Sequence, residues 1–242
     1  MKNDNGRITK EPKFCLDNSV IGDSWRMFRI MAEFVDGFEG MSAIDIPAVT
    51  IYGSARTKQD HKYYLLAEKI AAGLVEEGFA VLTGGGPGIM EAANKGAFSA
   101  GGLSVGLNIN LPHEQNLNPF VNFSLDFKYF FVRKVMLMKY STGFICMPGG
   151  FGSMDEIFES LTLIQTEKIE PFPIVLVGSE FWGGLVEWIE DKMIESGNIS
   201  PDDISLFKVI DDPAEVVAYI KNNCGQVDIS LVKGYNSFNT LG

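Results

Sequence analysis

The sequence predicts an α/β fold in which a parallel sheet carries helices on both faces. Short runs of apolar and β-branched residues alternate along the chain with longer segments of helical periodicity. The short runs are apolar throughout, which is typical of strands covered on both sides. Glycine-rich turns follow three of these runs directly. We therefore expect a doubly wound, Rossmann-like parallel sheet, with an added helical extension at the N-terminus.

The N-terminal part is predicted to hold one amphipathic helix. Apolar residues recur at helical spacing over residues 24–39, among them Trp25, Phe28 and Val35. This stripe needs a partner, either the body of the domain or another subunit. The predicted division of the chain is residues 1–45 for the extension, 46–225 for the Rossmann-like domain and 226–242 for a polar tail.

The elements of the main domain follow from the same alternation. The predicted strands are residues 48–52, 79–83, 103–108, 126–131, 143–147, 173–177 and 207–210. The predicted helices are residues 60–77, 87–100, 132–141, 153–168, 181–195 and one that begins at Asp212-Pro213, a common helix start. The long connection at residues 110–123 has the length of a lid or an interface segment.

Composition limits the kinds of partner. A net charge of −11 disfavours nucleic acid, which requires a basic surface. The three cysteines are far apart and form no CxxC motif, which favours a reducing cytoplasm over a disulfide framework. No apolar run reaches the length of a membrane span. The two histidines lie near no carboxylate cluster or serine elbow, so we expect neither a metal site nor a Ser-His-Asp triad.

Two glycine-rich turns point to a bound anion. One follows the strand at 143–147 and contains Gly149, Gly150 and Gly152; the other follows the strand at 79–83 with Gly84, Gly85 and Gly86. Each leads into a helix whose first N–H groups face the turn, which is a favourable place for phosphate. A P-loop is excluded because no Gly-Lys-Ser/Thr follows, and the G-x-G-x-x-G fingerprint is missing. A monophosphate fits these turns better than a nucleoside triphosphate or a nicotinamide cofactor.

Charged residues stand beside these turns. Arg133 and Lys134 lie at a predicted helix start, where the helix dipole disfavours cations, and Asp155 and Glu156 lie at the next one. Such a conflict with local preference is typical of a functional site. The alternative is that they are solvated surface charges and ordinary helix-start acids. Parallel strands bring these two helix starts to the same rim of the sheet.

Three segments together resemble a known family. They are Thr83-Gly-Gly-Gly-Pro-Gly-Ile-Met-Glu91-Ala-Ala-Asn-Lys-Gly-Ala97, Arg133-Lys134-x-Met136 and Pro148-Gly-Gly-Phe-Gly-Ser-Met-Asp-Glu156. The sequence resembles the LOG ("lonely guy") family of cytokinin riboside 5′-monophosphate phosphoribohydrolases, long labelled lysine decarboxylases. The similarity runs from about Trp25 to Tyr219. The predicted N-terminal helix from Trp25 to Glu39 and the segment at residues 106–115 resemble the longer bacterial branch of that family.

The resemblance implies hydrolysis of the N-glycosidic bond of AMP or an N6-substituted AMP, without a cofactor. It places the catalytic pair on Arg133 and Glu156, and substrate contacts on Glu91, Lys134, the 149–155 turn and Thr162. With the turns and the expected pocket walls, the predicted contacts are Ser54, Gly84, Gly85, Gly86, Glu91, Lys134, Met136, Gly149, Gly150, Phe151, Gly152, Ser153, Asp155 and Thr162. Ser153 stands where the family has Thr, which keeps the hydroxyl. Asp155 stands where the family has Glu, which shortens the carboxylate arm.

Several alternatives stay open at the level of sequence. A nucleotide-binding or molybdenum-cofactor carrier protein has a similar fold without catalysis, and a sensor of signalling nucleotides is a further option. Retention of both Arg133 and Glu156 favours the enzyme. Lysine decarboxylation requires a Schiff-base lysine with its own phosphate site, which nothing in the sequence marks. The resemblance also implies a homodimer or a higher homo-oligomer, and the base remains undetermined.

Overall fold

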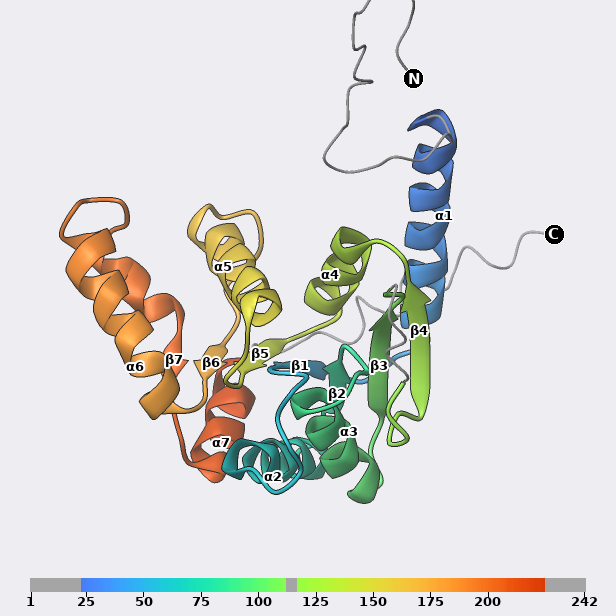
Figure 1. Ribbon diagram of the computed structural model, residues 1–242, viewed down its shortest axis with the longest axis horizontal. Helices are drawn as coiled ribbons and strands as arrows, with labels where there is room; N and C mark the ends of the chain where they lie inside the picture. The colour runs from blue at the N-terminus through green and yellow to red at the C-terminus, as the bar shows by residue number, and fades with distance from the viewer. Residues whose placement is uncertain (1–22, 112–116, 225–242) are drawn as a thin grey trace, which may run out of the picture.

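The computed structural model describes residues 23–111 and 117–224 of the chain. Its core is one sheet of seven strands in the order β4-β3-β2-β1-β5-β6-β7 (Figure 1). All neighbouring strands are parallel. The strands are β1 (Ala48–Tyr52), β2 (Ala80–Thr83), β3 (Ser104–Ile109), β4 (Phe123–Phe127), β5 (Gly143–Cys146), β6 (Ile174–Leu176) and β7 (Lys208–Val209). The predicted doubly wound parallel sheet is confirmed.

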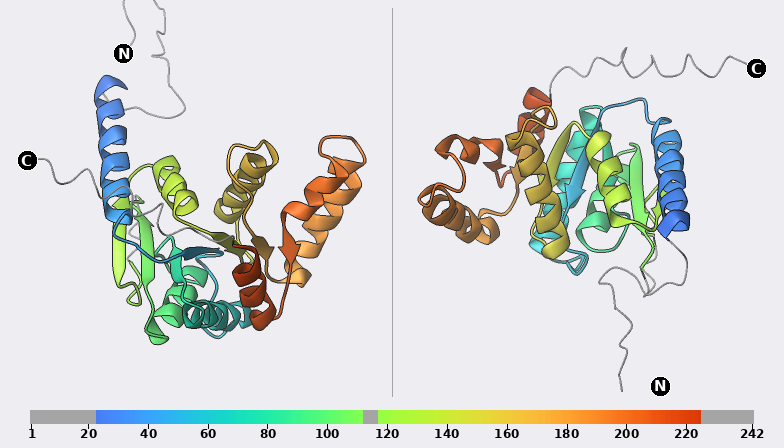
Figure 2. Two further views of the ribbon diagram at one scale, coloured as in Figure 1. Left: turned by 180° about the vertical axis from the view of Figure 1, so that it is seen from behind. Right: turned by 90° about the horizontal axis from the view of Figure 1, so that it is seen from above.

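Helices cover both faces of this sheet (Figures 1 and 2). One face carries α2 (Lys62–Glu76), α3 (Ile89–Ser99) and α7 (Pro213–Asn223). The other carries α1 (Asp23–Met41), α4 (Phe130–Lys139), α5 (Phe151–Gln165) and α6 (Ser179–Trp188). A π-helix (Ile189–Ile194) continues α6, and a 3₁₀-helix (Pro201–Leu206) precedes β7.

Two apolar cores lie on the two faces of the sheet. Alternate residues of β1 divide between them: Val49 and Ile51 face α2 and α3, whereas Ala48 and Tyr52 face the side of α4 and α5. Every residue of β1 is buried, as expected for the central strand of a parallel sheet. The uniformly apolar runs of the sequence are explained by this double coverage.

The N-terminal helix predicted at residues 24–39 is α1, and it packs on α4 and β4. Gly37 lies against Met136 and Gly40 against Leu125, and a Cβ on Gly40 would lie only 2.7 Å from the Leu125 Cδ2. Both carboxylate oxygens of Glu33 accept backbone N–H groups where the chain enters α4. The opposite face of α1 leaves large apolar side chains exposed: Trp25, Phe28, Met31, Val35 and Phe38.

One predicted strand is wrong in position. The expected strand at residues 126–131 is β4 at Phe123–Phe127, and the last residues of the prediction belong to the turn and to the start of α4. Phe130 and Phe131 are half-exposed in the first helical turn instead of buried in the sheet. Their aromatic side chains resemble a strand in the sequence, but the sheet register requires β4 to begin earlier, with Phe123 opposite Val105.

Some expectations fall on parts of the chain that the structure does not describe. They concern residues 1–22, the tail from residue 225, and residues 112–116 with His113 in the predicted lid or interface loop. Within the described ranges, none of the helices combines the length and the apolar character that crossing a bilayer requires.

Candidate active site

The candidate site lies where the strand order reverses. β1 pairs with β2 on one side and with β5 on the other, so the chain winds in opposite directions from this point. In doubly wound sheets, ligands bind beyond the carboxyl ends of the strands at such a switch point. The turns that follow β1, β2 and β5 therefore form the floor of the candidate site.

These three turns are joined by backbone hydrogen bonds. The N–H of Ser54 donates to the carbonyl of Pro148 at 3.0 Å, and the N–H of Ile89 donates to the carbonyl of Ser54 at 3.0 Å. Gly88 has a φ of +71°, and a Cβ there would lie 2.3 Å from the Ser54 carbonyl oxygen. Glycine is required at this contact, and the predicted placement of the three turns on one rim is confirmed.

The turn after β5 leads directly into the N-terminus of α5. The helix begins at Phe151 with Gly150 as its N-cap, and no side chain caps its first N–H groups. A Cβ on Gly149 would lie 2.2 Å from the Ser153 hydroxyl, so the turn and the first helical turn are in close contact. Free N–H groups at a helix start attract an anion, and the buried Ser153 hydroxyl lies beside them.

This early helix start corrects the predicted position of the acidic residues. The sequence places Asp155 and Glu156 in the first turn of a helix that begins at residue 153. The helix begins at Phe151, and no acid lies in its first turn. Asp155 and Glu156 therefore lie in the second turn, where the helix dipole has little effect on them.

Arg133 and Glu156 form a nearly buried ion pair between α4 and α5. The Arg133 Nη2 lies 3.5 Å from the Glu156 Oε1, and the two side chains are 11 % and 12 % exposed. Within the described chain, the buried Arg133 Nε has no hydrogen-bond partner. An unpartnered buried donor is rare and is expected to serve a ligand or an ordered water. The Phe130 ring stacks near this guanidinium, with its centroid 5.3 Å from Cζ.

Burial changes the acid–base properties of this pair. Loss of solvation raises the pKa of Glu156 to about 7, although the Arg133 charge opposes the rise. Burial lowers the pKa of Arg133, with Glu156 acting in the opposite direction. The Tyr52 side chain at the end of β1 is also buried here, and burial followed by the Glu156 charge raises the pKa of its phenol. A carboxyl with a pKa near 7 can change its charge at physiological pH.

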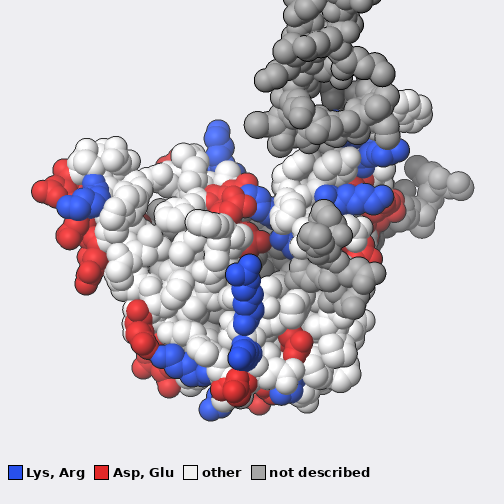
Figure 3. All heavy atoms as spheres, in the orientation of Figure 1, with Lys and Arg blue, Asp and Glu red and all other residues white. Residues whose placement is uncertain are grey.

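Lys134, the next residue of α4, also faces α5 and lies beside a groove along that helix. Burial lowers its pKa, but ion pairs with Glu159 at 2.7 Å and Asp155 at 2.9 Å outweigh this and raise it overall. Charges of both signs are visible over the space between α5 and α4 (Figure 3). The groove has a volume of about 590 Å³, and it is lined by Lys134, Phe151, Met154, Asp155, Phe158, Glu159, Thr162 and Leu163.

The other predicted contacts divide into those near the site and those away from it. Phe151 is 95 % exposed at the mouth of the groove, and a Cβ on Gly84 would lie 3.2 Å from the Arg133 Nη1. Glu91 accepts hydrogen bonds from Tyr64 at 2.9 Å and Gln59 at 2.7 Å, which hold it at the start of α3. Met136 is fully buried beneath α1 and does not line the groove.

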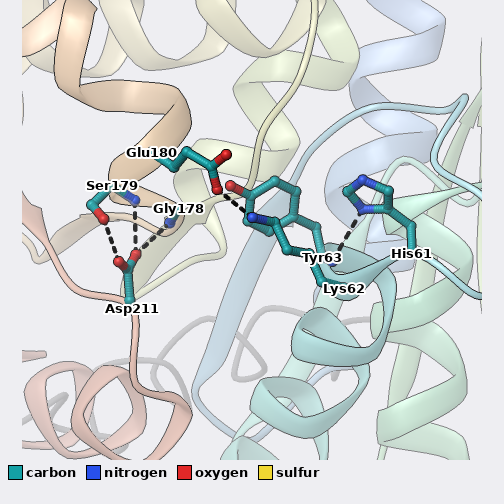
Figure 4. A network of polar contacts seen from close by, with 7 residues as sticks. All are labelled: His61, Lys62, Tyr63, Gly178, Ser179, Glu180 and Asp211. Atoms are coloured by element: carbon teal, nitrogen blue, oxygen red, sulfur yellow. Dashed lines mark hydrogen bonds and ion pairs between the residues drawn. The ribbon is translucent and has the colours of Figure 1, made fainter.

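The N-terminus of α6, on the same rim, is occupied by a residue of the chain itself. Asp211 accepts hydrogen bonds from the N–H groups of Gly178 and Ser179, both at 2.8 Å, and from the Ser179 hydroxyl (Figure 4). Beside it, Lys62 forms an ion pair with Glu180. The helix start of α6 thus has a built-in anion, whereas no side chain caps α5.

Sequence reasoning missed three residues of the site. Tyr52 was expected only as the end of a strand, yet it lies beside Glu156. Tyr64 holds Glu91, and Asn118 donates to the carbonyls of Gly85 and Gly86. For Asn118, the sequence does offer one signal: Asn118 precedes Pro119, and an Asn-Pro pair favours the start of a turn.

Comparison with known proteins identifies the relatives of this chain. Residues 90–220 match the model of the family described as "Possible lysine decarboxylase". A cytokinin riboside 5′-monophosphate phosphoribohydrolase of Mycobacterium tuberculosis is 28 % identical over 158 residues, which cover 61 % of this chain and 79 % of the relative. A probable enzyme of the same name from Oryza sativa subsp. japonica is 27 % identical over 157 residues, 63 % of each chain. This match spans less than two thirds of the rice protein.

Solved structures share the architecture. The molybdenum cofactor binding protein from Rippkaea orientalis superimposes with a TM-score of 0.54 at 20 % identity, covering 73 % of this chain and 96 % of that one. Identity at this level shows a common fold. The family model, in contrast, covers more than half of the 242 residues and spans the Arg133–Glu156 pair. The chain therefore belongs to this family, the LOG family whose motifs its sequence carries.

Proposed function

We propose that the protein is a nucleoside 5′-monophosphate N-glycosidase that hydrolyses AMP or an N6-substituted AMP to the free base and ribose 5-phosphate. The observation that carries this proposal is the nearly buried Arg133–Glu156 pair beside the uncapped N-terminus of α5. The helix start offers a place for the 5′-phosphate, and the pair offers the charged groups that act on the attached sugar. The names of the relatives from M. tuberculosis and rice support the same reaction.

The chemistry assigns a role to each member of the pair. When the N-glycosidic bond breaks, its electron pair leaves with the base, and the sugar carbon gains oxocarbenium character. An ionised Glu156 stabilises this positive charge and accepts a proton from the water that attacks the same carbon. The base takes up a proton, so the overall reaction consumes one water. The free Nε of Arg133 donates a hydrogen bond to a ribose oxygen and orients the sugar.

Phosphate binding is assigned to the turn at Gly149–Ser153. Its N–H groups and the Ser153 hydroxyl lie next to Glu156 on the same helix. For the base and an N6 substituent we propose the apolar side chains of the groove, Phe151, Met154 and Phe158. The groove adjoins the pair through Lys134 and Asp155, the neighbours of Arg133 and Glu156 in the chain, and neither member of the pair lines it. In this arrangement the phosphate anchors the substrate, and a nucleoside without it binds poorly.

Lysine decarboxylation receives no support from the lysine at this site. A Schiff base requires a neutral amine, whereas Lys134 is held between Asp155 and Glu159 in its charged form.

The experiment that tests the proposal is chromatographic detection of base release. Purified protein is incubated with AMP, N6-isopentenyl-AMP, CMP and GMP, and in parallel with the corresponding nucleosides. We expect release from one or more monophosphates, and at least about tenfold less from the matching nucleoside. Equal rates with and without the 5′-phosphate would contradict the phosphate anchor. Binding of a nucleotide without any release would favour a carrier or sensor.

We also propose that the protein is a cytoplasmic homodimer or higher homo-oligomer. Its described cysteines, Cys146 and Cys224, are free thiols, which suits a reducing compartment. The apolar side chains on the outer face of α1, Trp25, Phe28, Met31 and Val35, are more than half exposed in the single chain. A continuous apolar helix face of this kind is expected to be covered by a second copy.

A further inference from the structure

A buried network of side chains holds the Gly84–Gly86 turn from behind. Asn118 is 5 % exposed, and its Nδ2 donates to the carbonyls of Gly85 at 3.1 Å and Gly86 at 3.0 Å. The N–H of Asn118 also donates to the Gly85 carbonyl at 2.8 Å. Two consecutive carbonyls of the turn are therefore fixed in direction by one residue.

The network continues into the core through Asn94. Its Oδ1 accepts from Asn118 at 2.9 Å and from the Thr83 hydroxyl at 2.6 Å. Its Nδ2 donates to the Ser104 hydroxyl at 2.8 Å, so both ends of the amide are in use. The Thr83 hydroxyl in turn accepts the N–H of Gly85 at 2.9 Å. Buried networks in which every group has a partner are rigid, and this one fixes the turn after β2.

The direction of the Gly85 carbonyl determines the direction of the next N–H. In a trans peptide, the C=O and N–H groups of one unit point to opposite sides. Because the Gly85 carbonyl faces Asn118, the Gly86 N–H points away from Asn118. No hydrogen bond among the described residues uses this N–H. The next residue, Pro87, has no backbone N–H. The Gly86 N–H is therefore the last backbone donor of the turn before Gly88.

The Arg133 guanidinium lies close to this turn. A Cβ on Gly84 would lie 3.2 Å from the Arg133 Nη1, whereas a Cβ on Gly85 would lie 2.8 Å from the Leu117 Cδ1. The turn is thus packed between the segment that carries Asn118 and the guanidinium of the catalytic pair. The Gly86 N–H is a preorganised donor, because the hydrogen bonds to the Gly85 and Gly86 carbonyls already fix the backbone of the turn before a ligand binds.

We infer that Asn118 is a positioning residue, which presents the Gly86 N–H to an oxygen of the bound nucleotide. The inference rests on the proposed function, because it assigns the donor to that substrate. It also gives the 117–121 segment a part in binding, although this segment lies outside the glycine motifs. Asn118 acts through the backbone of the turn and touches no reacting atom.

Asn122 provides a matched control at the opposite rim of the sheet, where the strands begin. Asn122 follows Asn118 in the same connection, and it also bonds to backbone: it accepts from the Ser104 N–H at 2.8 Å and donates to the Gly102 carbonyl at 2.9 Å. These contacts lie at the amino end of β3, away from the site. Asn122→Ala therefore removes comparable hydrogen bonds without touching the turn.

The test compares KM for AMP in Asn118→Ala and Asn122→Ala. We expect Asn118→Ala to raise KM about tenfold, as for one lost ligand hydrogen bond, and Asn122→Ala to leave KM unchanged. A merely structural role lowers the amount of folded enzyme, which reduces the apparent kcat but not KM. An unchanged KM in Asn118→Ala would overturn the inference.

A second pair of variants covers the case in which Asn118→Ala does not fold. Thr83→Val removes the acceptor of the Gly85 N–H at nearly constant volume, and Thr83→Ser keeps it. We expect a raised KM in the first and rescue in the second. The dissociation constant of AMP, measured by calorimetry on the same variants, gives a readout independent of catalysis. If wild-type protein binds AMP but releases no base, the proposed function fails while the inference is still tested. If AMP does not bind, the inference fails as well.

Discussion

Glu156 is the residue at which the proposed activity and the stability of the fold have opposite requirements: the activity requires an ionised carboxyl, and the fold is more stable with a neutral one. Its side chain is nearly buried. Among the described residues, its one ion-pair partner is the Arg133 guanidinium, at 3.5 Å. Burial raises its pKa to about 7, so ionisation is harder in the folded protein than in the unfolded chain. The proposed catalytic role accounts for a carboxyl at this position, since its ionised form lowers the stability of the folded protein.

The raised pKa predicts the pH dependence of the reaction. Glu156 acts as an anion in the proposed mechanism, so kcat/KM for AMP should rise with pH and level off above a pKa of about 7. The measurement is a pH–rate profile with buffers of constant ionic strength. A profile that is already flat between pH 5 and 8 would show that the rate does not depend on this ionisation.

The same shift predicts how stability changes with pH. The folded protein holds the Glu156 proton more tightly than the unfolded chain does, so the carboxyl destabilises the fold as pH rises from its ordinary pKa of 4.5 to about 7. Glu156→Gln should therefore be more stable than wild type above pH 7, by about 3 kcal/mol at most. Below pH 4.5 the difference should vanish. Thermal melts of both proteins across this range test the sign, and a less stable variant at pH 8 would contradict it.

Single residues also show what the sequence did and did not reveal. Arg133 and Glu156 were predicted on one rim because strands and helices alternate regularly, and the structure brings them together. Tyr52 and Asn118 were missed because their roles depend on neighbours far away in the chain. Nothing in the sequence near Asn118 indicates that its amide meets Gly85, Gly86 and Asn94.

At the level of elements, two helix starts on the same rim differ in what occupies them. The N–H groups of Gly178 and Ser179 at the start of α6 donate to the Asp211 carboxylate, whereas the start of α5 has no side-chain cap. A helix start without a cap leaves its N–H groups available to a ligand anion. This difference supports the proposal that the phosphate binds at the start of α5 rather than at the start of α6.

The contact between Gly149 and Ser153 provides a test of this assignment. Gly149→Ala places a methyl group where the Ser153 hydroxyl lies, so the first turn of α5 must shift. We expect KM for AMP to rise about tenfold or more, because a small displacement at a binding site weakens several contacts together. Binding of free ribose 5-phosphate, measured by calorimetry, should weaken in parallel.

Gly183→Ala in α6 is the matched control. The added methyl group meets no atom within 4 Å outside its own helix backbone and chain neighbours. Alanine also favours a helix interior over glycine by about 0.5–1 kcal/mol. It should raise the melting temperature and leave KM unchanged. If Gly149→Ala behaved in the same way as Gly183→Ala, the turn after β5 would not hold the phosphate.

Element boundaries were the part of the fold that the sequence predicted least well. The run from Phe127 to Phe131 is rich in aromatic residues and resembles a strand, but its second half begins α4. There Phe130 serves the site by lying near the Arg133 guanidinium. The start of α5 was placed two residues late because the glycines of its first turn were read as loop. Both errors fall at the rim, where functional demands override local preference.

At the level of the whole molecule, the two faces of the sheet differ in how well they are covered. Helices α2, α3 and α7 pack on one face, and α1 lies on the other, at the β4 edge of the sheet (Figure 2). The outer face of α1 keeps large apolar side chains exposed. The net charge of −11 disfavours close approach of two copies, so the proposed assembly depends on an apolar contact.

We expect the assembly to depend on α1. Phe28→Glu introduces a charge into the exposed stripe, and it should reduce the mass measured by light scattering toward that of a single chain. Phe98→Glu, which changes a half-exposed aromatic residue of α3 on the opposite face, is the control and should keep the wild-type mass. A monomeric wild-type protein, or equal masses for all three, would contradict the proposed role of α1.

The overall architecture was predictable because apolar central strands and regular helices leave few alternatives to a doubly wound sheet. The central claim, that Glu156 is catalytic in a phosphate-anchored glycosidase, depends on side-chain placement and is tested most directly by one comparison. Base release from AMP is measured for wild type, Glu156→Gln and Glu167→Gln. Glu167 lies beyond the end of α5, so Glu167→Gln serves as the control for the same chemical change away from the site. We predict a loss of at least about a hundredfold in kcat for Glu156→Gln and none for Glu167→Gln. Turnover by Glu156→Gln at the wild-type rate would contradict the account.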